Sequence, residues 1–165
     1  MTLVLDVQNL RISFPGAGKG RVYPVDGVSF GLERGRTLAL VGESGCGKSH
    51  TSLALLRLQP PPGRIEEGSS IRLGDTDVLA LEGDALRRIR GRRIGMIFQD
   101  PMTSLNPVFT VGDQIAEGVR AHFDVSRAEA RRRALTLLQE VGTPIPRRGS
   151  TPIRTSSAAG CGNGS

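Results

Sequence analysis

Residues 42–49 read Gly42-Glu43-Ser44-Gly45-Cys46-Gly47-Lys48-Ser49, which fits the pattern G-x-x-x-x-G-K-S. The run before them, residues 37–41 (TLALV), is apolar and β-prone, and residues 51–58 after them are helical in character. Strand, glycine-rich loop and helix in this order predict a loop whose backbone N–H groups turn toward an anion at the positive end of a helix. We prefer a phosphate-binding loop to a glycine-rich turn without a ligand, because a bare turn has no need of Lys-Ser at this spacing.

Two side chains of this loop carry the chemistry that a bound nucleotide needs. We expect Lys48 to reach the β- and γ-phosphates and the Ser49 hydroxyl to ligate Mg²⁺. His50 follows Ser49 directly, and we include it among the residues predicted to bind the nucleotide. Cys46 is interpreted as a small loop residue, since it and Cys161 have neither metal-ligand spacing nor the density of a disulfide scaffold.

The composition limits the size and class of the protein. With 165 residues, 38% of them hydrophobic, the chain is expected to form one modest globular domain or an incomplete piece of a larger one. No apolar run approaches the roughly 20 residues that span a bilayer, and no basic region precedes a long apolar stretch at the N-terminus. We therefore expect a chain that starts in the cytosol.

The net charge of +6 comes from 22 basic and 16 acidic residues, and the arginines gather at residues 87–93 and 131–133. Such clusters could indicate nucleic-acid binding. Acidic residues lie close to both clusters, and aromatic residues make up only 4% of the chain, so few side chains could stack on bases. The sequence favours solvated helical faces and no nucleic-acid partner.

Periodicity and turn residues predict the other elements. A capping box of Ser126 and Glu129 predicts a helix that runs through Glu140 and is stopped by Gly142 and Pro144. The proline-rich stretch 60–63 is expected to end the helix that follows the loop. We also predict strands over 3–14, 25–32 and 94–98, a short strand and turn over 70–79, and helices over 81–90 and 111–122.

Three stretches together resemble the ATP-binding subunits of ABC transporters, and within them those of oligopeptide, dipeptide and nickel importers. They are GESGCGKS preceded by VDGVSFGLERGRTLALV, then IGMIFQDPMTSLNP at residues 94–107, then VGDQIAEGVRAHFDVSRAEARRRALTLLQEVG. The resemblance covers about residues 3–146, and FQDPMTSLNP is much more specific than the phosphate-binding loop, which many unrelated proteins share.

The resemblance implies an α/β fold of the P-loop NTPase (ABC ATPase) class. It implies the N-terminal part of that fold, with an antiparallel β-subdomain, the start of a helical subdomain and an incomplete core sheet. The expected domains are a partial nucleotide-binding core with the Walker A loop and Q-loop at 1–110, the start of the helical subdomain at 111–146, and a tail at 147–165.

The resemblance also implies residue roles, with ATP and Mg²⁺ as cofactors. Gln99 becomes the catalytic side chain that senses Mg²⁺ and the γ-phosphate. An aromatic residue upstream of the loop stacks on adenine in this family, and either Phe14 or Tyr23 could serve, although Phe14 could equally be a core residue at the end of its strand. Asp100 follows an apolar run, but it lies one residue beyond Gln99 and is not assigned as the Walker B aspartate.

The implied partners are membrane-spanning transporter subunits and a second ATP-binding subunit in a dimer, at the inner face of the cell membrane. The implied function is import of peptides or nickel. The family's signature motif, Walker B Asp-Glu and switch histidine cannot be read in these 165 residues, so we expect ATP binding without turnover. An inert or regulatory nucleotide-binding fragment remains an alternative. So does an unrelated P-loop kinase, whereas N-K-x-D and D-x-x-G, expected of a GTPase, do not occur.

The tail from residue 149 has the composition of a disordered segment. With permitted codons, a shift of one base turns residues 153–165 into YPHQLSGGMRQRV, which resembles the family's signature motif with its flanks. We therefore predict a shift of reading frame near residues 146–148. A core sheet that lacks its later strands would also leave residues 37–41 exposed and prone to association.

Overall fold

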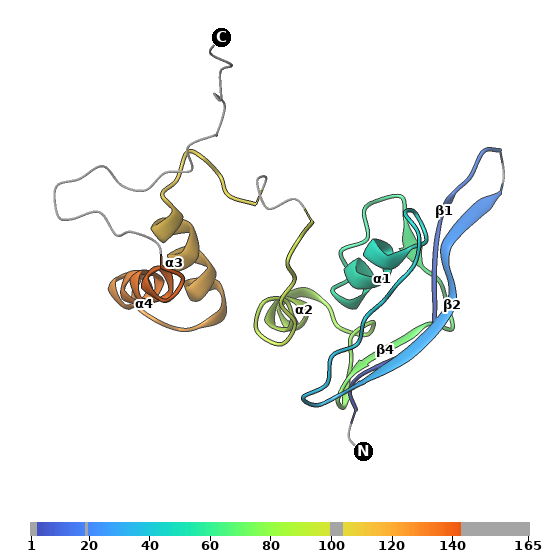
Figure 1. The fold of residues 1–165 in the computed structure, drawn as a ribbon, viewed down its shortest axis with the longest axis horizontal. Helices are drawn as coiled ribbons and strands as arrows, with labels where there is room; N and C mark the ends of the chain where they lie inside the picture. Colours follow the sequence, from blue (N-terminus) through green and yellow to red (C-terminus); the bar gives the residue numbers. More distant parts are fainter. Residues whose placement is uncertain (1–2, 19, 100–103, 143–165) are drawn as a thin grey trace, which may run out of the picture. The chain divides into compact units, whose positions relative to one another are not determined.

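The computed structural model describes residues 3–18, 20–99 and 104–142 (Figure 1). By its contacts the chain divides into two units, Met1–Ile94 and Gly95–Ser165. The predicted domain boundaries at 110/111 and 146/147 stay a prediction, and the tail at 147–165 lies outside the described residues, as does Asp100.

A long hairpin opens the first unit. β1 (Leu3–Pro15) pairs antiparallel with β2 (Arg21–Glu33), which confirms both predicted strands and begins the second one earlier. The pairing shifts register between Val7 and Leu10 of β1, where Asn9 has a φ of 48°. This bulge adds one residue to β1, so that Leu10, Ile12 and Phe14 lie on the same face of the sheet as Val7.

Three short strands complete an antiparallel sheet. They are β3 (Arg64–Ile65), β4 (Ser70–Leu73) and β5 (Thr76–Asp77). The sheet order is β2-β1-β4-β5, and β3 pairs separately with β1. The described strands thus form the antiparallel β-subdomain that the sequence predicts.

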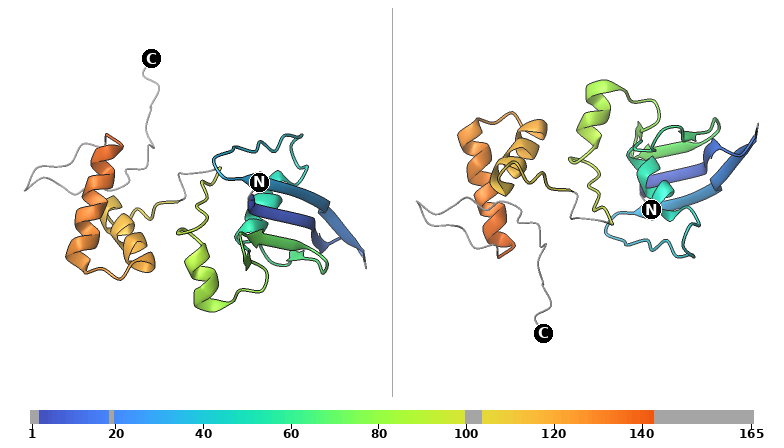
Figure 2. Two further views of the ribbon diagram at one scale, coloured as in Figure 1. Left: turned by 90° about the horizontal axis from the view of Figure 1, so that it is seen from below. Right: turned by 90° about the horizontal axis from the view of Figure 1, so that it is seen from above.

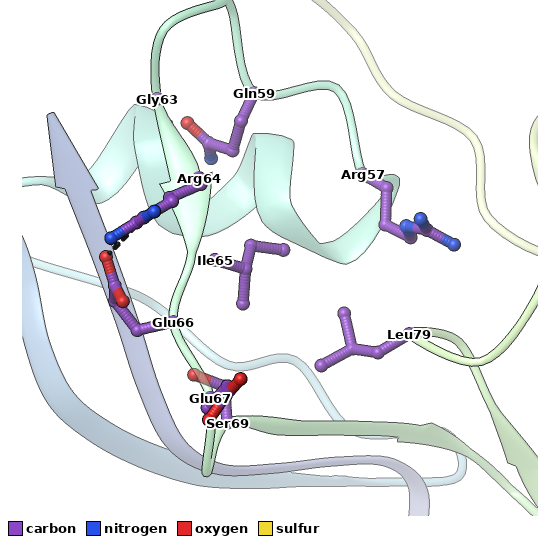
Figure 3. A pocket seen from close by; sticks show the side chains of 9 residues that line it. All are labelled: Arg57, Gln59, Gly63, Arg64, Ile65, Glu66, Glu67, Ser69 and Leu79. Atoms are coloured by element: carbon purple, nitrogen blue, oxygen red, sulfur yellow. Dashed lines mark hydrogen bonds and ion pairs between the residues drawn. The ribbon is translucent and has the colours of Figure 1, made fainter.

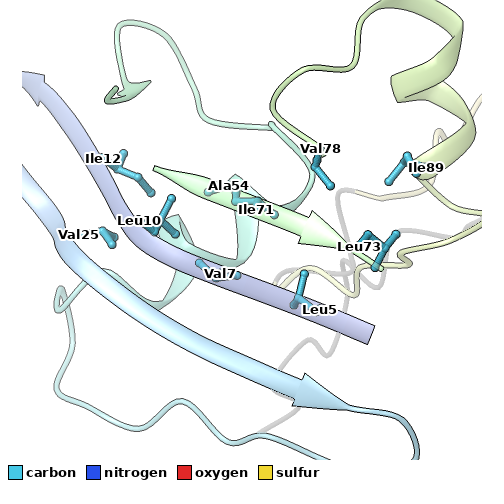
Figure 4. Packing of buried hydrophobic residues seen from close by; sticks show 10 residues of the cluster. All are labelled: Leu5, Val7, Leu10, Ile12, Val25, Ala54, Ile71, Leu73, Val78 and Ile89. Atoms are coloured by element: carbon cyan, nitrogen blue, oxygen red, sulfur yellow. The ribbon is translucent and has the colours of Figure 1, made fainter. Parts of the chain in front are cut away.

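The core of the first unit forms where α1 (Lys48–Leu55) lies against one face of this sheet (Figure 2). Leu10, Ile12 and Ile71 are fully buried, and burial of each side chain contributes about 1.5–3 kcal/mol. The apolar stripe of β1 therefore holds the helix in place. Figure 4 shows the members of this core cluster: Leu5, Val7, Leu10, Ile12, Val25, Ala54, Ile71, Leu73, Val78 and Ile89.

The end of α1 differs from the prediction. The helix stops at Leu55, before the proline-rich stretch, because Arg57 adopts a left-handed φ of 51°. The N–H of Leu58 donates to the carbonyl of Leu53 and the N–H of Arg57 to that of Ala54, which is a Schellman motif. A backbone reversal therefore ends the helix, and the prolines only follow it.

α2 (Gly83–Ile89) is shorter than the predicted helix over 81–90, and Arg90, its C-cap residue, caps the end of α1. Its guanidinium donates to the carbonyls of Leu56 and Arg57 at 2.8 and 2.9 Å. Arg87 pairs with Asp84 on the same helix. One arginine of the basic cluster at 87–93 thus caps a neighbouring helix rather than facing only solvent.

Two predicted strands are absent from the described residues. Residues 37–41 form no strand and are exposed, with Val41 at 90% exposure. Ile94 makes only an isolated bridge with Arg90, and Ile97 is 97% exposed. Both predictions were wrong for the same reason: a strand needs a neighbour for its backbone hydrogen bonds, and no described strand lies beside these runs. This agrees with the predicted incomplete core sheet.

In the second unit, α3 (Val111–His122) and α4 (Arg127–Glu140) confirm the two predicted helices, and they pack against each other as a helical hairpin. The Ser126 hydroxyl accepts from the N–H of Glu129, which confirms Ser126 as the N-cap, whereas the Glu129 carboxylate pairs with Arg133. Small residues at the contact, Ala116, Ala130 and Ala134, are buried and let the two helices approach closely. None of the helices within the described ranges is long and apolar enough to cross a membrane.

Candidate phosphate-binding site

The predicted loop, residues 42–49, leads into α1, which begins at Lys48. Gly45 and Gly47 have φ values of 83° and 91°, which L side chains rarely adopt. The N–H of Cys46 donates to the carbonyl of Glu43 at 3.3 Å, so the chain turns back on itself before the helix begins. The glycines therefore lie where the backbone conformation requires them.

Gly47 has a second reason to be glycine. A Cβ atom built on it would lie 2.2 Å from the carbonyl oxygen of Pro24 and 3.1 Å from Cγ2 of Val25, both in β2. A Cβ on Gly42 would lie 2.5 Å from Sγ of Cys46, on the opposite side of the loop. The loop is thus held against the hairpin at one end and closed on itself at the other.

Lys48 lies over the inside of the loop. Its Nζ donates to the carbonyls of Gly42 and Glu43, each at 2.7 Å, and lies 3.4 Å from Sγ of Cys46. The ammonium group is therefore held by neutral acceptors of the same loop. Phosphate oxygens accept stronger, charge-assisted hydrogen bonds from an ammonium group than carbonyls do.

The first turn of α1 offers donors to an anion. Gly47 is the N-cap and has no side chain that could bond the N–H groups of Lys48, Ser49 and His50. Ser49 is exposed at this end of the helix. Free N–H groups, a helix dipole and the nearby ammonium group of Lys48 fit the phosphates of a nucleotide.

The same loop fits Mg²⁺ bound together with phosphates. The part of the chain that the structure describes contains no cluster of three or more His, Cys, Asp or Glu residues that could hold a metal ion by itself. Mg²⁺ commonly keeps several waters and takes few protein oxygens besides those of the phosphates. The Ser49 hydroxyl suits that arrangement, and the metal roles of Ser49 and Gln99 stay predictions.

The two candidate aromatic residues lie on opposite faces of the hairpin. Phe14 follows Leu10 and Ile12 at steps of two along β1 and contacts the core cluster that contains Ala54 of α1. Tyr23 is 41% exposed, and its ring centroid lies 5.2 Å from the guanidinium carbon of Arg11. Arg11 alternates with Leu10 and Ile12, so Tyr23 lies on the face away from α1.

Phe14 and His50 contact each other. Their ring centroids are 4.9 Å apart and their planes are tilted by 56°. His50 Nδ1 lies 3.0 Å from Oε1 of Gln59, and Nε2 of Gln59 donates to the backbone carbonyl of His50. The first turn of α1 is therefore joined to β1 by one aromatic contact and to the segment after α1 by two hydrogen bonds.

A cavity of about 400 Å³ lies beside this contact (Figure 3). Gln59 and Gly63 line it, together with the ion pair between Arg64 and Glu66 at 3.0 Å. The hydroxyl of Ser13 and the guanidinium of Arg64 hold the pKa of the Glu66 carboxyl below its usual value. The charges of Arg64 and Glu66 offset each other, and the exposed carboxyl of Glu67 also lines the cavity.

The remaining predicted residues are exposed. Glu43 and Ser44 are exposed residues of the loop, and Gln99 is exposed in an irregular segment of the other unit. The catalytic role of Gln99 therefore stays a prediction. The sequence did not predict the contacts of Gln59 with His50 and of Gly63 with Phe14. The stretch 60–63 indicates only the end of a helix, and nothing in it or beside it indicates these partners.

A glycine-rich loop followed by a lysine at the start of a helix, beside an antiparallel β-subdomain, is typical of phosphate-binding α/β domains. The family model described as ABC transporter matches residues 25–157. The chain belongs to this family. The match continues past residue 148, and the predicted shift of reading frame stays a prediction.

Two relatives from Bacillus subtilis illustrate the similarity. The oligopeptide transport ATP-binding protein OppD is 48% identical over 147 residues, which cover 88% of this chain and 40% of OppD. The dipeptide transport ATP-binding protein DppD is 48% identical over 146 residues, which cover 88% of this chain and 43% of DppD. The chain thus spans less than half the length of these curated relatives.

The fold is similar to that of a solved ATP-binding cassette, a dimer in a post-hydrolysis state bound to ADP and phosphate. The TM-score is 0.71 at 22% sequence identity, over 92% of this chain and 61% of that one. At this identity the likeness establishes the fold, which is the N-terminal part of an ABC ATPase, as the sequence predicts.

Proposed function

We propose that this chain is the ATP-binding part of an ABC transporter subunit that couples ATP to the import of peptides across the cytoplasmic membrane. The observation that carries the proposal is the loop of residues 42–49, with the Lys48 ammonium group held by its carbonyls and α1 beginning at Lys48 itself. The names of the relatives favour peptides as the solute, and nickel is the alternative that the sequence leaves open.

In the proposed site the chain's own residues bind and neutralise the phosphates. Bound Mg-ATP supplies the phosphoanhydride bond whose cleavage drives transport. Backbone N–H groups at the start of α1 donate to phosphate oxygens, while Lys48 exchanges its carbonyl acceptors for charged ones. Ser49 contributes a hydroxyl to the metal, and Gln99 is proposed to sense the metal and the terminal phosphate.

We assign adenine stacking to Phe14 rather than Tyr23. Phe14 lies on the face of the hairpin that carries α1, and it contacts His50, the residue directly after Ser49. Tyr23 lies under Arg11 on the other face. A base stacked on an aromatic ring gains about 1–3 kcal/mol. Removal of the Phe14 ring should therefore weaken ATP binding roughly 5- to 150-fold, whereas Tyr23→Ala should change it little.

The proposed partners are the membrane-spanning subunits of the importer and a second ATP-binding subunit at the cytoplasmic side. The solved relative of the same fold is a dimer, which supports the second partner. A polypeptide of these 165 residues alone is proposed to bind ATP without turning it over, because the groups that activate water cannot be read in its sequence.

Solute uptake tests the proposal. The predicted shift of reading frame is corrected, so that the coding sequence continues in the frame of the signature motif. The resulting protein is expressed together with the membrane subunits of its importer, in cells that lack their own peptide importer. Labelled peptide should accumulate with the unaltered chain and not with Lys48→Ala, whereas Lys19→Ala, the matched change at the other lysine, should leave uptake unaltered. Accumulation with Lys48→Ala would contradict the role of the loop, and nickel uptake without peptide uptake would replace the solute.

A further inference from the structure

The Phe14 ring has two close neighbours, Gly63 and His50. Phe14 is half-buried, and a Cβ atom on Gly63 would lie 2.4 Å from Cε1 and Cζ of its ring. His50 lies at a centroid distance of 4.9 Å on the α1 side of the same ring. The backbone of Gly63 therefore meets the ring at its Cε1 and Cζ atoms, where a side chain would have no room, and the imidazole in the first turn of α1 meets the ring at a tilt.

Gln59 fixes the imidazole. Its Nε2 donates to the backbone carbonyl of His50, and this orients the amide so that Oε1 faces Nδ1 of the ring. Oε1 can only accept, so the 3.0 Å contact is a hydrogen bond in the tautomer whose Nδ1 carries the proton. One side chain thus holds both the backbone and the ring of His50.

We propose that His50 is a positioning residue which, braced by Gln59, holds the Phe14 ring in the orientation that stacks on the base of the nucleotide. The inference rests on the proposed function and assigns the base-binding part of the site to a set of contacts outside the phosphate-binding loop. The phosphates and the base are then held by separable groups: the loop and Lys48 hold the former, and Phe14 with His50 and Gln59 holds the latter.

This separation has a direct test with two probes. Mg-ATP contacts both parts, whereas Mg-tripolyphosphate offers the phosphates without a base. Dissociation constants of both are measured for the unaltered 165-residue chain and for His50→Ala, His50→Phe and Gln59→Ala. His122→Ala is the matched control, because it removes the other histidine of the chain from α3 in the second unit.

His50→Ala and Gln59→Ala should weaken Mg-ATP binding about three- to tenfold and change Mg-tripolyphosphate binding less than about twofold. His50→Phe keeps an aromatic ring against Phe14 and should recover part of the loss. His122→Ala should change neither constant. Unaltered binding of Mg-tripolyphosphate also demonstrates that the loop of each variant is folded.

Equal losses for both probes would overturn the inference, because His50 would then support the loop as a whole. Unchanged Mg-ATP binding in His50→Ala would overturn it as well. In both cases the proposed function stands, since the unaltered chain binds the nucleotide. Failure of the unaltered chain to bind either probe would overturn the proposed function, and the inference with it.

Discussion

Gly47 and Gly45 form a natural pair for testing how the phosphate-binding loop is held. Both have positive φ, 91° and 83°, so alanine is strained at either position. A Cβ on Gly45 meets nothing within 4 Å, whereas one on Gly47 would lie 2.2 Å from the backbone oxygen of Pro24. The two substitutions therefore share the conformational cost and differ in the collision with β2.

The expected magnitudes follow from this difference. A left-handed backbone costs a non-glycine residue about 1–2 kcal/mol, and this is the whole expected loss for Gly45→Ala. In Gly47→Ala the carbonyl of Pro24 must also retreat by roughly 1 Å to reach ordinary contact distance. Overpacking of this kind costs about 1–3 kcal/mol more. Gly47→Ala should therefore lose about 2–5 kcal/mol in total.

Urea unfolding followed by circular dichroism measures both losses, and Mg-ATP titration measures the effect on the site. We expect Gly47→Ala to be less stable than Gly45→Ala and to lose nucleotide binding, because its loop must separate from β2. Equal free energies of unfolding for the two variants would refute the reasoning. So would a Gly47→Ala chain that binds Mg-ATP as the unaltered chain does.

Arg90→Met should lower the free energy of unfolding of the first unit by about 1–3 kcal/mol in urea, because it leaves the carbonyls at the end of α1 without their donor. Arg88 is an exposed neighbour, and Arg88→Met should change this free energy by less than about 0.5 kcal/mol. The hydrogen bond from Arg131 lowers the pKa of the Asp113 carboxyl in the folded chain. Their pairing therefore stabilises the fold at pH values above the unfolded pKa of about 3.9, and this stabilisation is lost as the pH falls through the lowered pKa of the folded chain. The urea midpoints of Asp113→Asn and the unaltered chain should accordingly differ at neutral pH and converge near pH 2, and a constant difference would contradict this. Cys46 is exposed and lies beside Lys48. Alkylation of the Cys46 thiol should therefore block Mg-ATP binding, and bound Mg-ATP should slow the alkylation. Equal alkylation rates of this thiol with and without the nucleotide would argue against the site.

Local chemistry made much of the fold predictable from the sequence. Alternation of apolar residues gave the first strand of the hairpin, and Ser126 with Glu129 marked the start of α4. Glycines followed by Lys48 indicated the loop, because few other reasons place these residue types at this spacing. Each of these features depends on residues that are close together in the chain.

The errors have a different origin. Residues 37–41 have the composition of a buried strand, but a strand also needs partners, and none of the described strands supplies them. The end of α1 depends on the left-handed conformation of Arg57 and on Arg90, which is far along the chain. Contacts that do not follow a helical or strand period, such as that of Gln59 with His50, leave no periodic trace in the sequence.

The central claim is that residues 42–49 bind the phosphates of ATP and that Lys48 neutralises their charge. Calorimetric titration of Mg-ATP into the folded, soluble 165-residue chain, and into its Lys48→Ala variant, tests it most directly. We predict saturable binding of a single nucleotide by the unaltered chain and loss of that binding in the variant. A folded chain that takes up no nucleotide, or a variant that binds as tightly as the unaltered chain, would contradict the claim.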